Sequence, residues 1–126
     1  MKTKSSQRSG FTLLEIMIAV SIIGLLATIA IPNFLKSREI SQLNTIYSNL
    51  RIIESAKDQW ALENKKGTGT AIGSLSTISD YFKGGTIKPA VGETYAVNTV
   101  GSASTATATV KLGTYNSGSP ITAPPF

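Results

Sequence analysis

Apolar residues follow three different patterns along this chain. Residues 11–35 are almost continuously apolar, with Glu15 as their one charged residue. Residues 40–60 instead repeat apolar side chains every three or four positions, which predicts an amphipathic helix. Residues 67–126 consist of short runs rich in Thr, Ala, Val and Tyr between Gly and Ser, which predicts strands and turns. The pattern therefore predicts an α+β fold, in which a long N-terminal helix is packed by a small antiparallel β-hairpin or sheet.

The first apolar segment has the length of a membrane span. From Phe11 to Ile31 an α-helix of 1.5 Å rise per residue extends roughly 32 Å, about the hydrocarbon thickness of a bilayer. Lys2, Lys4 and Arg8 precede the segment. Since positive flanks stay in the cytoplasm, we expect the N-terminus to remain there and the rest of the chain to be exported.

Three interpretations compete for this segment. The first is a secretory signal cleaved after Ala30, and the second is an ordinary signal anchor. The third keeps the apolar helix and removes a short leader after Gly10. A carboxylate within a membrane helix costs about 3 kcal/mol, and the first two interpretations give Glu15 no use. The third interpretation gives it a partner.

The third interpretation is also a family resemblance. The run Gly10-Phe11-Thr12-Leu13-Leu14-Glu15, followed by Ile16-Met17-Ile18-Ala19-Val20 and later by Pro32, resembles the N-terminus of type IV pilins and type II secretion pseudopilins. The resemblance covers residues 8–35 strongly and does not extend to the C-terminal half. It implies a pilin-like fold and a structural filament subunit, with a type II secretion pseudopilin as the leading candidate. Such a subunit is stored in the bacterial inner membrane as a single-pass protein, with its C-terminal part in the periplasm.

The resemblance implies a role for particular residues. A prepilin peptidase would cut between Gly10 and Phe11, and the new amine of Phe11 would be N-methylated. In the filament, Glu15 of one subunit would pair with the Phe11 amine of a neighbour. Gly24 and Pro32 would bracket a flexible stretch of the helix, because Pro32 removes a backbone donor.

Four regions are expected along the chain. They are a cleaved leader at residues 1–10, a transmembrane and assembly helix at 11–35, its amphipathic continuation at 36–66, and a C-terminal loop and β region at 67–126. One helix is expected from Phe11 to about Asn64, a length of roughly 80 Å. Trp60 offers the largest apolar surface of the amphipathic half, and we expect it to anchor the sheet on the helix.

The C-terminal region is expected to contain one short helix and a hairpin. Ser74 is placed to cap a helix with Leu75, Ile78 and Phe82 on one face. Strands are predicted at 94–100 and 105–110, joined by a turn at 101–104. A third extended segment is predicted around 111–115, and the tail after residue 117 is expected to be irregular.

Composition excludes several classes of protein. The 126 residues include no Cys and no His, so thiol and Ser-His-Asp catalysis and most zinc sites are excluded. The net charge of +5 is concentrated in the leader, because residues 11–126 carry nine Lys and Arg against seven Asp and Glu. We therefore expect no catalytic residues and no nucleic-acid partner, except where the filament is a DNA-uptake pilus.

No metal or other cofactor is expected either. Some secretion pseudopilins bind calcium in their C-terminal region. Asp80 and Glu93 are the acidic residues after position 66 here, and they lack the spacing of a calcium loop.

The sequence alone does not decide which filament system this subunit belongs to. A short chain without a Cys pair favours a pseudopilin over a large adhesive pilin. A short type IV pilin of a surface or DNA-uptake pilus is the alternative, and a membrane-anchored binding module is a third. The expected partners are copies of the chain in a helical filament, the lipid bilayer, prepilin peptidase, and an inner-membrane assembly platform with its ATPase. The assembled filament would lie in the periplasm or at the cell surface.

Overall fold

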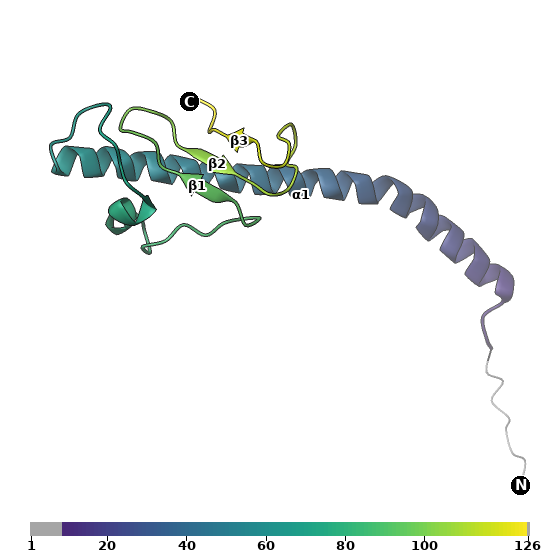
Figure 1. Ribbon diagram of the computed structural model, residues 1–126. Helices are drawn as coiled ribbons and strands as arrows, with labels where there is room; N and C mark the ends of the chain where they lie inside the picture. The colour runs from purple at the N-terminus through teal and green to yellow at the C-terminus, as the bar shows by residue number, and fades with distance from the viewer. Residues whose placement is uncertain (1–8, 126) are drawn as a thin grey trace, which may run out of the picture. The chain divides into compact units, whose positions relative to one another are not determined.

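A single long helix carries most of the regular structure. The computed structural model describes residues 9–125, and the basic residues Lys2, Lys4 and Arg8 of the expected leader lie outside the described residues. Helix α1 runs from Leu13 to Glu63 and contains Pro32. The chain divides into two units, Met1–Leu35 and Lys36–Phe126. The helix and a small antiparallel sheet together confirm the predicted α+β fold (Figure 1).

Helix α1 ends in a tight backbone turn. The N–H of Lys66 donates to the carbonyl of Ala61 at 2.8 Å, and the N–H of Lys65 donates to Leu62 at 3.3 Å. Lys65 has a φ of +52°, so it occupies the left-handed position that follows many helices. The left-handed residue at this helix end is therefore a lysine and not Gly67, which follows two positions later.

The sheet has three short antiparallel strands in the order β1-β2-β3. They are β1 at Thr94–Ala96, β2 at Thr105–Thr107 and β3 at Pro120–Ile121. Thr94 pairs with Thr107 in the first ladder, and Ala106 pairs with Ile121 in the second. The strands lie along the C-terminal part of α1 in Figure 1.

The strand predictions were right in number and partly wrong in position. The first two strands are shorter than the predicted 94–100 and 105–110. Residues 111–115 form a turn closed by a bridge between Leu112 and Tyr115, so the predicted third strand is absent there. The third strand lies instead in the tail that was expected to be irregular. Ile121 explains the difference, because it is 1% exposed and pairs with β2 where it can pack on the core.

Two apolar clusters hold the second unit together. The sheet cluster joins α1 to the strands and contains Ile46, Leu50, Ala106, Ala108, Leu112 and Ile121. The loop cluster lies further along α1 and contains Ile53, Ala56, Ala61, Ile72, Ile78, Phe82 and Val100. Tyr95 packs against both clusters.

The short helix after α1 forms as a 3₁₀ helix, η1, at Leu75–Tyr81. Ser74 precedes it in extended conformation without the predicted side-chain cap bond. Trp60 is half-buried against the loop cluster, which contains η1 residues. The sheet itself rests on α1 through Ile46 and Leu50, so Trp60 contacts the loop and η1 side of the unit more than the strands.

Gly101 lies where the loop before β2 crosses the loop after α1. The N–H of Gly69 donates to the carbonyl of Val100 at 2.8 Å, and the N–H of Val100 donates to Thr70 at 3.0 Å. Gly101 has a φ of +84°, and a Cβ built on it would lie 2.6 Å from Cγ2 of Thr68. The position therefore favours glycine for its backbone conformation, and an added Cβ would also have to displace the exposed side chain of Thr68.

Replacing Gly101 with alanine is expected to lower the free energy of unfolding by about 2–4 kcal/mol, because left-handed strain and overpacking add. Gly84→Ala is the matched control, since Gly84 has a φ of +95° but nothing within 4 Å of an added Cβ. It should lose about 1 kcal/mol from strain. Denaturant unfolding followed by near-ultraviolet circular dichroism measures both. Equal losses for the two variants would show that the contact with Thr68 is unimportant.

Candidate functional site

The junction between Gly10 and Phe11 is exposed and precedes the first turn of α1. Both residues lie in the described non-helical stretch before Leu13, and Phe11 is 81% exposed. Among the described residues, nothing lies within 4 Å of a Cβ built on Gly10. As far as residues 9–125 are concerned, the peptide bond between Gly10 and Phe11 is therefore accessible to an enzyme.

Thr12 and Glu15 form a reciprocal cap at the start of α1. The backbone N–H of Thr12 donates to Oε2 of Glu15 at 3.4 Å, and the N–H of Glu15 donates to Oγ1 of Thr12 at 3.2 Å. This is a capping box, which satisfies two N–H groups that the helix itself leaves without partners. Glu15 thus has a structural partner within its own chain, and its negative charge also suits the helix N-terminus. The sequence interpretation missed this role, although the Thr-x-x-Glu spacing of a capping box is present.

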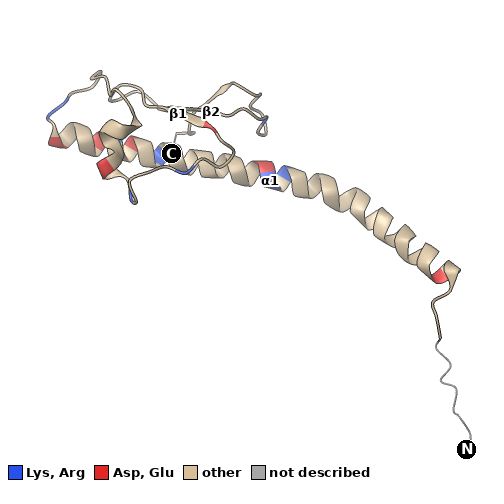
Figure 2. Cartoon of the chain, turned by 60° about the horizontal axis from the view of Figure 1, so that its bottom comes forward, with Lys and Arg blue, Asp and Glu red and all other residues tan. Residues whose placement is uncertain are grey.

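The first part of α1 exposes a nearly continuous apolar surface. One 18-residue window has a mean hydropathy of 2.5 with none of its residues buried, so the helix is long and apolar enough to cross a membrane. In Figure 2 the ribbon of this stretch is tan apart from one red segment near its start, where Glu15 is the acidic residue of the first turn. The hydroxyls of Ser21 and Thr28 donate to the carbonyls of Met17 and Gly24 at 2.7 and 2.8 Å. These polar atoms are satisfied within the helix, which allows the surface to face lipid or apolar partners.

Lys57 is a charged residue of α1 that is fully buried, with 0% of its surface exposed. Its Nζ lies 3.0 Å from Oε2 of Glu54 and donates to the carbonyl of Ser102 at 2.5 Å and to Oγ of Ser104 at 3.3 Å. The N–H of Ser104 donates to Oε1 of Glu54 at 2.6 Å. Lys57 and Glu54 therefore link α1 to the loop before β2, with the ammonium buried and the carboxylate 36% exposed.

Glu93 forms a second buried link. Its carboxylate is 3% exposed and accepts bonds from the N–H groups of Ala90 and Val91, both at 2.9 Å, and from the hydroxyl of Tyr95. Nδ2 of Asn49 donates to the Tyr95 hydroxyl at 2.8 Å, which ties this network to α1. Burial works to raise the pKa of Glu93, but the bonds from Tyr95, Val91 and Ala90 outweigh it and hold that pKa below its ordinary value of 4.5.

The described residues do not fit a calcium site. Calcium takes six to eight oxygen ligands, several of them carboxylates. No three His, Cys, Asp or Glu side chains of residues 9–125 come together in a group that could hold a metal ion. Both oxygens of Glu93 already accept hydrogen bonds, and Asp80 is exposed on η1.

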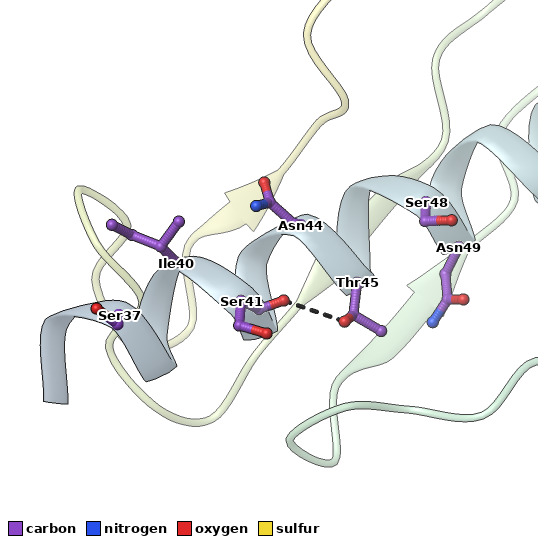
Figure 3. Close-up of a pocket in the computed structure, with 7 residues that line it drawn as sticks. All are labelled: Ser37, Ile40, Ser41, Asn44, Thr45, Ser48 and Asn49. Atoms are coloured by element: carbon purple, nitrogen blue, oxygen red, sulfur yellow. Dashed lines mark hydrogen bonds between the residues drawn. The ribbon is translucent and has the colours of Figure 1, made fainter. Parts of the chain in front are cut away.

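A shallow polar groove of about 500 Å³ follows the outer face of α1 in the second unit. Figure 3 shows the side chains that line it, which are Ser37, Ile40, Ser41, Asn44, Thr45, Ser48 and Asn49. The Thr45 hydroxyl donates to the carbonyl of Ser41 at 3.0 Å. Hydroxyl and amide groups without a charged residue among them offer no catalytic constellation in this groove.

Known proteins share the N-terminal motif. Residues 5–31 match a family model described as the prokaryotic N-terminal methylation motif. The type II secretion system core protein G of Klebsiella michiganensis is 36% identical over 76 residues, which cover 60% of this chain and 53% of that protein. The same core protein of Vibrio cholerae is 31% identical over 93 residues, covering 68% and 64%.

A pilin is also among the similar proteins. The type IV major pilin protein PilA of Myxococcus xanthus is 44% identical over 57 residues, covering 45% of this chain and 26% of the pilin. No solved structure matches this chain. The chain spans about half the length of the curated relatives it matches. These matches confirm the resemblance to type IV pilins and type II secretion pseudopilins that residues Gly10 to Glu15 predicted.

Proposed function

We propose that this chain is the structural subunit of a type IV pilus-like filament, a type II secretion pseudopilin that is stored in the inner membrane. The observation that carries the proposal is the stretch from Gly10 to Glu15, where an exposed Gly-Phe junction immediately precedes a capped apolar helix. The methylation-motif match at residues 5–31 and the similarity to core protein G support the same assignment. The proposed role is structural and not enzymatic.

Processing prepares the N-terminus for assembly. Prepilin peptidase cuts between Gly10 and Phe11, and the new amine on Phe11 is then methylated. A lone ammonium and a lone carboxylate are each costly in an apolar layer. Pairing Glu15 of one subunit with the Phe11 amine of its neighbour offsets both costs and sets the axial stagger between copies. Such an interface is heterologous and does not close, so it generates a helical filament.

The membrane stores the subunit before assembly. Lipid covers the exposed apolar surface of the first unit in the precursor, and neighbouring copies of α1 cover it in the filament. The C-terminal part lies in the periplasm, and an inner-membrane platform with its ATPase supplies the energy. Gly24 and Pro32 give this part of the helix the freedom to adjust during assembly.

A short type IV pilin of a surface or DNA-uptake pilus is the second candidate, which the match to the Myxococcus xanthus pilin favours. Electron microscopy of cells with and without the gene, together with assay of secreted proteins, separates the two. A pseudopilin is expected to be needed for secretion and to form no long surface fibres at native expression. Loss of surface fibres with normal secretion would favour the pilin, and loss of neither would favour a membrane-anchored binding module.

The variant Gly10→Ala is expected to accumulate as the uncleaved precursor, because the peptidase must approach the backbone at a residue without a side chain. The added methyl meets none of residues 9–125 within 4 Å, so a processing defect reports on the enzyme and not on the described fold. Intact mass spectrometry of membrane fractions measures the precursor fraction. Gly24→Ala is the matched control, since that position is equally open and should be cleaved normally. A normal mature N-terminus in Gly10→Ala would contradict the proposed cleavage.

A further inference from the structure

Lys57 is surrounded by oxygen atoms from two distant parts of the chain. Glu54 supplies carboxylate oxygens from the preceding turn of α1, at 3.0 and 3.1 Å from Nζ. The loop before β2 supplies the carbonyl of Ser102 and the hydroxyl of Ser104. The Lys57 side chain is 0% exposed and Ser104 is 1% exposed, whereas the Glu54 side chain is 36% exposed, so the ammonium is buried while the carboxylate of this oxygen cage reaches solvent.

A carboxylate, a carbonyl and a hydroxyl are the donor types that proteins offer to hard cations. Lysine is almost never fully buried unless it is paired, because removing an ammonium from water is expensive. Here the same three kinds of oxygen accept hydrogen bonds from the Lys57 ammonium. Hydrogen bonds from Ser104 and Lys57 also hold the pKa of Glu54 below its ordinary value of 4.5, although burial works to raise it.

We propose that the cage of Glu54, Ser102 and Ser104 is a cation-binding site that Lys57 fills from within, so that an internal ammonium fastens the loop before β2 to α1 without a metal ion. It follows that the cage, when emptied, binds a small alkylammonium ion. A cavity of about 410 Å³ adjoins it and is lined by Glu54, Ser102 and Ser104, which gives such an ion a route from solvent. The same lining contains Arg51 and Asp58, so charged side chains of both signs lie beside the cage.

Chemical rescue tests this site. Lys57→Ala removes three carbons and the nitrogen, which n-propylammonium replaces. In the full-length chain in detergent, near-ultraviolet circular dichroism should show Lys57→Ala and Lys57→Met melting about 5–10 °C below the wild type, because the Ser102 carbonyl and the buried Ser104 hydroxyl lose their donor, whereas the Glu54 side chain is 36% exposed and is hydrated. Propylammonium chloride should raise the Tm of Lys57→Ala by several degrees but not that of Lys57→Met, whose side chain fills the space. Tetramethylammonium, which has no N–H to donate, should have no effect.

Three controls complete the experiment. Lys111→Ala, at an exposed lysine, should melt like the wild type and ignore propylammonium. Ser104→Ala should lower the Tm more than Ser102→Ala, because Ser102 contributes its backbone carbonyl. EDTA and calcium chloride should leave the wild-type Tm unchanged.

Several outcomes would overturn the proposal. They are a Lys57→Met variant as stable as the wild type, a folded Lys57→Ala that does not respond to propylammonium, or a wild-type chain that EDTA destabilises. Should Lys57→Ala fail to fold, the comparison of Ser104→Ala with Ser102→Ala decides, and equal Tm values for these two would reject the cage.

Discussion

Glu15→Ala is expected to insert in the membrane normally and to abolish filament assembly. Removing a carboxylate from an apolar segment makes insertion easier by about 3 kcal/mol, so the precursor pool should not fall. The neighbour's Phe11 amine, however, loses its counter-charge in the apolar layer, which leaves an unpaired cation there. Fractionation of the membrane measures insertion, and shearing followed by immunoblotting measures assembled filament.

The capping box gives this prediction a competing explanation. Glu15 also accepts a hydrogen bond from the N–H of Thr12, so Glu15→Ala loses a helix cap worth about 1 kcal/mol. Glu15→Gln separates the two roles, because glutamine serves in a capping box but carries no charge. Thr12→Ala does the reverse, since it removes the hydroxyl that caps Glu15 and keeps the carboxylate.

If Glu15 acts by charge pairing, Glu15→Gln should lose filament assembly to the same extent as Glu15→Ala. Thr12→Ala should then retain substantial assembly. Capping predicts the opposite order. Glu39→Gln is the matched control for loss of a helix carboxylate elsewhere on α1, and it should assemble. Normal filaments from Glu15→Gln would reject the proposed pairing with Phe11 and leave the capping box as the role of Glu15.

Local patterns predicted the helix, the apolar segment and the exposed junction, because each of these depends on neighbouring residues. The spacing of Ile46, Leu50 and Ile53 indicated the buried face of α1 directly, and these side chains are 0–1% exposed. The apolar run from Phe11 likewise needs no distant contact to be recognised. These features carry most of the candidate assembly site.

The buried polar links could not be predicted in the same way, because their partners are distant in sequence. Glu54 and Lys57 at a spacing of three resemble an exposed helix ion pair. Lys57 is buried because it bonds to Ser102 and Ser104, which lie 45 or more residues away. Ile121 similarly joins the sheet through a pairing with Ala106 that no local alternation reveals. The Thr12–Glu15 cap differs, since its spacing was visible in the sequence.

Glu93→Gln is expected to destabilise the second unit by about 2–4 kcal/mol. It should also reduce the loss of stability that the unit shows at low pH. An amide cannot accept all three hydrogen bonds that the carboxylate accepts from Ala90, Val91 and Tyr95, so it leaves a buried N–H or hydroxyl without a partner. Thermal or denaturant unfolding of the full-length chain, followed by the near-ultraviolet signal of Trp60, measures the loss. Asp80→Asn, at an exposed acid on η1, should have little effect.

The pH dependence follows from the lowered pKa of Glu93. Above its ordinary value of 4.5 the carboxyl is ionised in both the folded and the unfolded chain, so its contribution is fully present. As the pH falls below 4.5, the unfolded chain binds a proton first, and the contribution is lost until the folded pKa is passed. Stability of the wild type should therefore be constant near neutral pH and should fall below about pH 4.5. In Glu93→Gln, part of this loss of stability at low pH should remain, because the pKa of Glu54 is also lowered. An unchanged acid profile in Glu93→Gln would show that the buried carboxylate does not contribute to it.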